Sequence, residues 1–243
     1  MSSQLHSYPT PELMQQACAQ ALEHRIRLAL AKKGSAFLSL AGGSALAIYR
    51  KLAQAKLEWT AVSIVPTDER WVSANHAACN LTALKSCFAA RNLIQWLPLV
   101  PDLPPEFDSY PGNPGAPKPS THSAIKTLAA MPIPFDAVLL GMGLDAHTAS
   151  LFPGTSQLSA ALALKSITSA VAITPKPLPK EAPFARISLT ASRLLHSDAI
   201  LLAITGEAKR EVLNRALLRD DEALPISRFL HATDATLQVY WSA

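Results

Sequence analysis

A short glycine-containing loop, Gly141-Met-Gly-Leu-Asp-Ala-His147, carries an aspartate and a histidine two residues apart. A histidine that is accessible to substrate and oriented by a carboxylate can accept and return a proton near neutral pH. His147 is therefore the candidate general base, and Asp145 is the candidate group that orients its ring. Lone histidines more often have structural roles, so this hypothesis depends on the polar residues that the fold brings nearby.

A second polar cluster, Asp68-Glu69-Arg70, combines two carboxylates with a cation. One acid could take part in proton transfer, while Arg70 could bind a ligand or keep an acid ionised. A salt-bridged loop would have the same composition, and these residues alone do not decide between the two interpretations.

Two further clusters contain the residue types of anion-binding sites. In Gly42-Gly43-Ser44, glycines allow close approach of a ligand to the backbone, and a following helix would offer free N–H groups. Lys209 follows Gly206 in the first turn of an expected helix, where a cation opposes the helix dipole unless an anion binds there. Arg186 could add a forked guanidinium to the same site. A tight turn, an exposed lysine and a surface salt bridge are the structural alternatives.

Hydrophobic patterning predicts the elements that must position these clusters. Thr10, Pro11 and Glu12 predict the start of a helix that ends at Gly34. Strands are expected at 36–41, 61–65, 136–140, 167–174, 186–189, 199–204 and 235–241. Further helices are expected at 44–52, 80–88, 121–130, 190–196 and 207–218. This alternation predicts an α/β fold: a doubly wound, Rossmann-like, mostly parallel sheet with helices on both faces, in a single domain spanning 1–243.

The predicted fold also says where a ligand should bind. In open α/β sheets, ligands bind at the carboxyl ends of the strands, near a switch in strand order. The polar clusters that contain Ser44, Asp68, His147 and Lys209 each follow an expected strand, so we expect them to meet at one edge of the sheet. The segment 98–119 contains eight prolines and two glycines, which predicts a surface loop or a lid over this site.

Composition narrows the class of protein. With 49% hydrophobic and 16% charged residues, the chain can bury a core, and disorder is not expected. The net charge of +4 comes from scattered cations, which suits a small anionic ligand and predicts no nucleic-acid partner. The stretch from Met1 to Pro11 is polar, so we expect no signal peptide. No run approaches the ~18 apolar residues that a membrane span needs, so we expect no membrane span. Three cysteines without a CxxC pair predict a reducing compartment, the cytoplasm.

Several catalytic classes have no matching motif. Asp145 and His147 are too few ligands for a metal site, and no HExxH is present. Ser150 does not lie in a GxSxG motif, which disfavours a serine esterase. We therefore expect no metal site.

Several segments resemble the 6-phosphogluconolactonase family, within the glucosamine-6-phosphate isomerase/deaminase-like group. The segment 140–153 reads LGMGLDAHTASLFP and resembles the family signature LGMGxDGHxASLFP. The segment 38–44 resembles the sugar-phosphate loop, and 68–72 with His76 and Asn80 resembles a DERxV…H…SN block. The continuation ASLFP is similar to the lactonases rather than to the related deaminases.

The resemblance implies hydrolysis of 6-phospho-D-glucono-1,5-lactone to 6-phosphogluconate, in the oxidative pentose phosphate pathway, without a metal or organic cofactor. We also expect a monomer or weak homo-oligomer. His147 would activate the water, and the tetrahedral oxyanion would take donors from the 141–143 amides or from Arg70. The implied catalytic residues are His147, Asp145, Asp68 and Arg70. The implied phosphate-binding residues are Gly42, Gly43, Ser44, Arg186 and Lys209.

This chain departs from the family pattern in its glycine-rich loops. Ala45 and Leu46 replace the usual threonine and proline of GGSTP, Cys79 replaces a serine, and Ala146 replaces the glycine of GPDGH. If that glycine position needs a positive φ, Ala146 would be strained by roughly 1–2 kcal/mol. Two alternatives therefore remain: a deaminase or isomerase of an amino-sugar phosphate, and a non-catalytic sugar-phosphate-binding protein.

Overall fold

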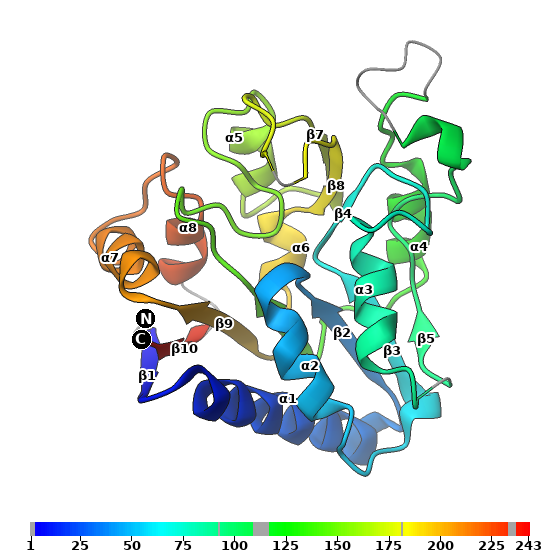
Figure 1. Cartoon of the computed structure of the whole chain (residues 1–243), viewed down its shortest axis with the longest axis vertical. Coiled ribbons are helices and arrows are strands. Elements are labelled where there is room, and N and C mark those ends of the chain that lie inside the picture. The colour runs from blue at the N-terminus through cyan, green and yellow to red at the C-terminus, as the bar shows by residue number, and fades with distance from the viewer. Residues whose placement is uncertain (1–2, 92, 109–116, 181, 233–236) are drawn as a thin grey trace.

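A parallel β-sheet forms the centre of the computed structural model, which describes residues 3–91, 93–108, 117–180, 182–232 and 237–243. Across these ranges, seven strands pair in the order β1-β10-β9-β6-β2-β3-β5, with β1 at one edge (Figure 1). Every pair of neighbours in this sheet is parallel. The strands are β1 (Gln4–Tyr8), β2 (Ala36–Leu40), β3 (Val62–Pro66), β5 (Gln95–Trp96), β6 (Ala137–Leu140), β9 (Ile200–Thr205) and β10 (Leu237–Ser242).

The strand order reverses between β2 and β6. From β2 the chain adds β3 and then β5 on one side, and it returns to place β6, β9 and β10 on the other. The two strands on either side of this reversal pair directly, with Leu38 opposite Ala137 and Leu40 opposite Leu139. The predicted doubly wound sheet is therefore confirmed, and its switch point lies at the carboxyl ends of β2 and β6.

Helices cover both faces of the sheet, as alternation along β6 shows. Ala137 and Leu139 belong to one buried cluster and Val138 and Leu140 to another. The first cluster includes side chains of α1 (Pro11–Lys33), α2 (Leu46–Leu52) and α3 (Asn80–Cys87). The second includes side chains of α4 (His122–Ala129), α5 (Leu158–Leu162), α6 (Ala191–Leu195), α7 (Glu207–Ala216) and α8 (Ile226–Leu230). Short 3₁₀ turns cover Gly43–Ala45, Trp59–Ala61 and Pro105–Phe107.

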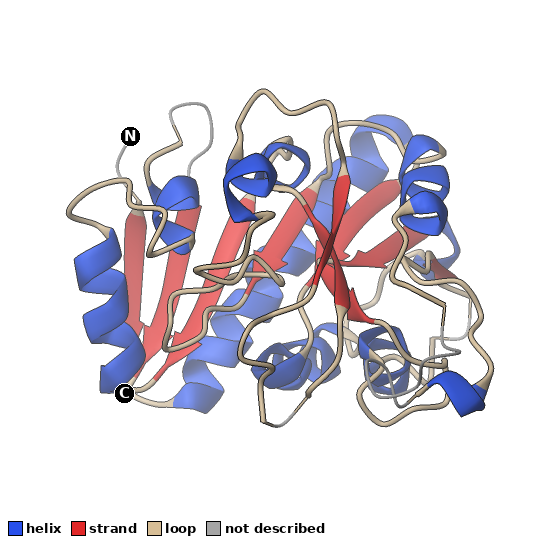
Figure 2. Cartoon of the chain, turned by 90° about the horizontal axis from the view of Figure 1, so that it is seen from above, coloured by secondary structure: helices blue, strands red, loops and turns tan. Residues whose placement is uncertain are grey.

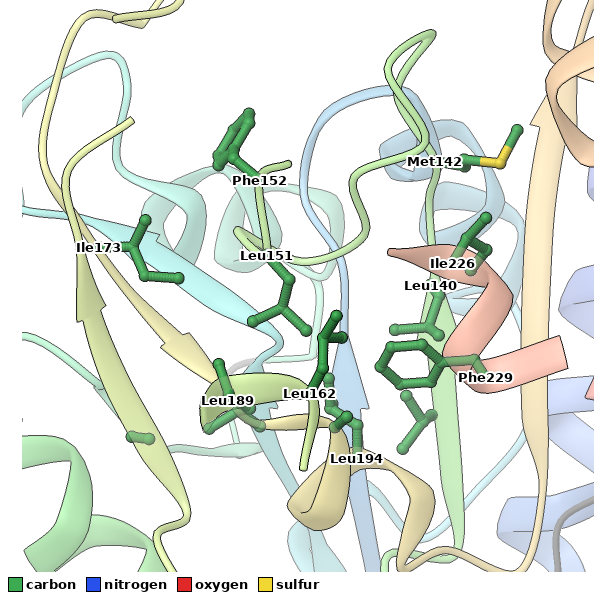
Figure 3. Packing of buried hydrophobic residues seen from close by; sticks show 14 of the residues in the cluster. Leu140, Met142, Leu151, Phe152, Leu162, Ile173, Leu189, Leu194, Ile226 and Phe229 are labelled. Carbon is green, nitrogen blue, oxygen red and sulfur yellow. The ribbon is translucent and has the colours of Figure 1, made fainter. Parts of the chain in front are cut away.

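The second cluster brings the core up to the polar loops. Figure 3 shows Leu140 of β6 beside Ile226 and Phe229 of α8, with Met142 of the following loop above them. The loop that carries the candidate base therefore rests on a packed apolar layer. None of the helices in the described part of the chain has the length and apolar character that crossing a bilayer requires.

A smaller antiparallel sheet lies beside the main one, in the order β4-β8-β7 (Figure 2). It contains β4 (Asp68–Arg70), β7 (Ala170–Ile173) and β8 (Arg186–Leu189). Thr67 joins the two sheets, because its amide donates to Leu40 (3.1 Å) and its carbonyl accepts from Leu189 (2.9 Å).

The sequence analysis predicted strands at 167–174 and 186–189 but did not predict that they leave the main sheet. It also predicted no strand at 68–70, whereas this segment is β4. Apolar patterning indicates that a strand forms, but its pairing partner depends on contacts distant in sequence. The elements β1, β5, α5 and α8 were not predicted. Each has at most five residues, too short for a clear periodic signal.

The first turn of α3 is capped by a carboxylate from β4 rather than by its own flanking residue. Glu69 Oε1 accepts from the amides of Arg70 (2.8 Å) and Asn80 (2.7 Å), and Oε2 accepts from the amide of Leu81 (2.7 Å). Cys79, at the N-cap position, makes no side-chain cap. Glu69 is only 3% exposed. Burial raises the pKa of Glu69 and the three amides lower it. Burial is the larger effect, and the pKa rises from 4.5 to about 7.

This raised pKa predicts a specific dependence of stability on pH. Because ionised Glu69 is disfavoured in the folded state, its contribution to the free energy of unfolding is full below pH 4.5 and is lost as pH rises through 7. Glu69→Gln should remove this dependence, which corresponds to about 3 kcal/mol between the two limits. Urea unfolding of both proteins at several pH values measures it. The exposed Glu211→Gln is the control, and parallel curves for the wild type and Glu69→Gln would contradict the prediction.

Candidate active site

A cavity of about 360 Å³ lies at the carboxyl ends of β3, β2, β6 and β9, which are consecutive neighbours in the sheet. All four polar clusters predicted from the sequence reach it. Its lining residues are Ala41, Gly42, Gly43, Ser44, Asp68, Arg70, Asn80, Gly141, Met142, Gly143, His147, Ala149, Arg186 and Lys209. Of the predicted site residues, only Asp145 does not line the cavity. Asp145 contacts His147, which does.

The histidine and aspartate of the loop after β6 form a pair. His147 Nδ1 lies 2.5 Å from Asp145 Oδ1, and the same oxygen accepts from the His147 amide at 3.2 Å. Burial raises the pKa of Asp145, but the hydrogen bond and charge of His147 outweigh it and hold the pKa below its usual value. An ionised Asp145 requires a proton on Nδ1 of the ring. Nε2 is then the nitrogen with a free lone pair.

The loop that holds this pair is closed by its own hydrogen bonds. The Gly143 amide donates to the His147 carbonyl (2.9 Å), and Thr148 Oγ1 donates to the Gly141 carbonyl (2.9 Å). A side chain at position 143 would meet the His147 ring at 2.3 Å, so glycine is required there. Ala146 has a φ of 64°, which confirms that the departure from glycine falls in the left-handed region.

Ala146 is nevertheless well anchored. Its methyl group is fully buried in the second core cluster. Its amide donates to the Gly143 carbonyl (3.1 Å) and its carbonyl accepts from the Ile226 amide (3.0 Å). Packing and these two bonds therefore hold an alanine in the conformation that a glycine would adopt freely.

Phe152 contacts both the candidate base and a candidate phosphate ligand. The His147 ring stacks on it with centroids 4.2 Å apart, and the guanidinium carbon of Arg186 lies 4.9 Å from its centroid. Phe152 is buried, so it fixes the two functional groups against one aromatic ring.

Three cations surround the cavity. Arg70 on β4 and Arg186 on β8 are directly paired across the small sheet, a placement that is unfavourable for like charges unless anions compensate. Burial lowers the pKa of Arg186, and Asp68 raises it in part. Burial also lowers the pKa of Lys209, whose ammonium makes no recorded hydrogen bond or ion pair with the described residues. The cavity therefore suits an anionic ligand.

Asp68 makes no hydrogen bond or ion pair with the histidine ring. Its Oδ1 accepts from Thr67 Oγ1 (3.1 Å) and its Oδ2 accepts from Ser150 Oγ (2.5 Å). Asp145 is thus the residue that contacts His147, and Asp68 supplies negative charge near Arg186. Glu69, between the two cavity-lining residues of β4, lines a separate cavity of about 430 Å³.

The glycine-rich turn after β2 packs tightly against α3. A side chain at position 42 would meet Asn80 Oδ1 at 2.1 Å, and Asn80 Nδ2 donates to the Asp68 carbonyl (2.8 Å). Gly43 has a φ of 65°, in the region that favours glycine. Ala45 is buried and Leu46 packs against the first core cluster. These two departures from the family pattern therefore face the core, and neither lines the cavity.

The structure narrows the donors available to an oxyanion. The Gly143 amide is already bound to the His147 carbonyl, so it is not available. Arg70 Nη1 donates to the Ala78 carbonyl (2.6 Å), while its guanidinium still lines the cavity. Arg70 and the backbone of Gly141 and Met142 remain the candidates.

The expected surface loop or lid at 98–119 falls in part on residues 109–116, which lie outside the described residues. The chain on both sides of them is bound to the segment after β4. Asp108 accepts from the Ser73 amide (2.5 Å) and hydroxyl (2.8 Å), and the Pro117 carbonyl accepts from Trp71 Nε1 (2.8 Å).

Sequence reasoning missed three contributors to this site: Ser150, Phe152 and Asn80. The sequence analysis gave none of the three a role in the site, because their roles depend on tertiary contacts. In the described ranges there is no group of three or more histidine, cysteine or acidic side chains arranged to hold a metal ion.

Comparison with known proteins agrees with this geometry. The model of the family described as glucosamine-6-phosphate isomerases/6-phosphogluconolactonase matches residues 9–241. A 6-phosphogluconolactonase of Rhizobium meliloti is 32% identical, with 100% of both chains covered. One of Pseudomonas putida is also 32% identical, covering 98% of this chain and 92% of its own. The crystal structure of a 6-phosphogluconolactonase from Shewanella baltica has a TM-score of 0.86 at 31% identity, covering 100% of this chain and 98% of that one.

The family model spans nearly the whole sequence, and the relatives align over almost their full lengths. This chain belongs to the family of glucosamine-6-phosphate isomerases and 6-phosphogluconolactonases.

Proposed function

We propose that this protein is a 6-phosphogluconolactonase, which hydrolyses 6-phospho-D-glucono-1,5-lactone to 6-phosphogluconate in the oxidative pentose phosphate pathway. The observation that carries the proposal is the convergence of a His147–Asp145 pair and three cations on one cavity. The similar proteins named 6-phosphogluconolactonase support the choice of this reaction over deamination.

The substrate's phosphate would bind at the end of the cavity formed by Gly42, Gly43, Ser44, Arg186 and Lys209. Backbone amides of the turn after β2 and the two cations supply donors and positive charge. Binding the phosphate fixes the lactone ring, so that binding energy from a remote group positions the carbonyl next to His147.

His147 would act as the general base. Nε2 takes a proton from water, and the water oxygen attacks C1 of the lactone, which pushes the carbonyl electrons onto the exocyclic oxygen. Asp145 stabilises the imidazolium that forms. The oxyanion would accept hydrogen bonds from Arg70 or from the amides of Gly141 and Met142.

The same imidazolium completes the reaction. When the carbonyl re-forms, the bond between C1 and the ring oxygen breaks, and Nε2 returns its proton to that oxygen. Asp68 would keep the local charge balanced beside Arg186. This sequence needs acid–base catalysis and electrostatic stabilisation only, so we propose no metal or organic cofactor.

The proposal extends to the organisation of the protein. Residues 1–243 would form one lactonase domain, because both buried clusters share the strands of the main sheet. The cavity is lined within one chain, which suits a monomer or weak homo-oligomer, without a nucleic-acid or membrane partner. Three buried free cysteines suit the cytoplasm.

Replacing the base tests the mechanism. His147→Ala should lower kcat for the phosphorylated lactone by about 10²–10⁴, the usual contribution of general acid–base catalysis. Lactone hydrolysis is followed by acid release in weak buffer, after subtraction of the spontaneous rate. The exposed His24→Ala is the control. A wild-type rate in His147→Ala would exclude His147 as the base, and ammonia release from glucosamine 6-phosphate by the wild type would favour a deaminase.

Removing the lysine after β9 tests the phosphate site. Lys209→Ala should raise KM for the phosphorylated lactone by about 10- to 100-fold, as expected for the loss of a hydrogen bond from a charged donor. Hydrolysis of the unphosphorylated lactone should not change. Lys51→Ala, which removes the same charge outside the cavity, controls for net charge. An unchanged KM would remove Lys209 from the phosphate site.

The alanine beside the base should be compatible with catalysis. Ala146→Gly relieves a backbone cost of about 1–2 kcal/mol but loses a buried methyl group (about 0.8 kcal/mol) and makes the unfolded chain more flexible (about 0.5–1 kcal/mol). These effects nearly cancel, so stability should change by about 1 kcal/mol or less and kcat by about threefold or less. Ala146→Val, with a β-branched side chain at positive φ, should impair both. A large gain in kcat from Ala146→Gly would show that the alanine distorts the loop.

A further inference from the structure

Ser150 has no solvent exposure and contacts two charged residues that line the cavity, Asp68 and Arg186. Its hydroxyl donates to Asp68 Oδ2 (2.5 Å) and accepts from Arg186 Nη1 (3.4 Å). Its amide donates to the hydroxyl of Ser188 (3.1 Å), on the same strand as Arg186. A single buried side chain therefore links the loop after His147 to both strands that carry the site's charges.

The hydroxyl connects two charges that do not meet. The carboxylate of Asp68 and the guanidinium of Arg186 do not form a direct ion pair. A hydroxyl can donate to a carboxylate and accept from a guanidinium at the same time, which neither a methyl group nor another cation can do. Ser150 therefore bridges the Asp68 carboxylate and the Arg186 guanidinium with two hydrogen bonds.

Arg186 needs this support because of its surroundings. It is 5% exposed, it lies opposite Arg70 across the small sheet, and its Nε has no hydrogen-bond partner among the residues that the structure describes. Besides Ser150, the Ala182 carbonyl holds it, accepting from Nη2 at 3.0 Å. Without Ser150, Nη1 would lose its recorded partner while the repulsion from Arg70 remained.

We propose that Ser150 is a positioning residue that holds the guanidinium of Arg186 where it binds the substrate's phosphate. This inference rests on the proposed function, in which Arg186 is a phosphate ligand. Ser150 acts through Arg186 rather than through the base, because the loop around His147 is closed by its own bonds between Gly143 and His147 and between Thr148 and Gly141.

Kinetics with two substrates test this role. Ser150→Ala should raise KM for the phosphorylated lactone about tenfold, the effect of losing one hydrogen bond to a charged group. It should leave kcat within about twofold, and kcat/KM for the unphosphorylated lactone should not change. Ser227→Ala is the matched control: Ser227 is equally buried and donates to the Asp221 carbonyl (2.9 Å), but it lies outside the cavity. It should leave both substrates unaffected.

A double-mutant comparison separates positioning from a general loss of structure. If Ser150 acts through Arg186, adding Ser150→Ala to Arg186→Lys should cause no further rise in KM. Additive effects, an unchanged KM in Ser150→Ala, or equal losses with both lactones would overturn the proposal. If Ser150→Ala does not fold, Ser150→Cys keeps the size of the side chain with a weaker hydrogen bond, and it should raise KM in the same selective way.

A binding measurement distinguishes failure of this inference from failure of the proposed function. If the wild type hydrolyses neither lactone, the lactonase proposal fails. Calorimetric titration with inorganic phosphate then still tests Ser150, since Ser150→Ala should weaken phosphate binding about tenfold. Equal phosphate affinity in the wild type and Ser150→Ala would overturn the inference about Ser150.

Discussion

The direct parallel pairing of β2 with β6 is the constraint on which the site depends. These strands are far apart in sequence, and the strand order reverses between them. At such a reversal the connections leave the sheet in opposite directions, so the loops that follow the two strands open a crevice instead of covering it. The turn at Gly42–Ser44 and the loop at Gly141–His147 border this crevice. Their neighbours β3 and β9 add Asp68 and Lys209 to the same cavity.

The small antiparallel sheet brings positively charged side chains together at the site. It places Arg70 and Arg186 side by side, where like charges repel each other, and burial lowers the pKa of Arg186. Asp68 provides part of the compensating negative charge, and the Ser150 hydroxyl bonds to both Asp68 and Arg186. We propose that the substrate's phosphate provides the remaining negative charge. A site that is electrostatically incomplete without its ligand gains binding energy when the anion enters.

Rigid packing beneath the loops gives the polar groups their geometry. Phe152 contacts both the His147 ring and the Arg186 guanidinium, so the proposed base and the proposed phosphate ligand are held against one buried side chain. Ala146 adopts a left-handed conformation because its methyl group is enclosed in the core and its backbone is bonded on both sides. Strain in the loop is thus opposed by contacts outside the catalytic groups.

The sequence by itself determined the alternation of strands and helices, the caps at Thr10 and Gly34, and the four polar clusters, because these depend on periodicity and residue type within short windows. The family resemblance raised the question of whether position 146 needs a positive φ, and the structure answered it. Only the tertiary structure decided that β4, β7 and β8 form their own sheet, that Asp145 rather than Asp68 contacts His147, and that the Gly143 amide is already occupied. The role of Ser150 belongs to the same group, since its partners lie 82 and 36 residues away. Contacts over such separations are set by how whole elements pack, and no local pattern encodes them.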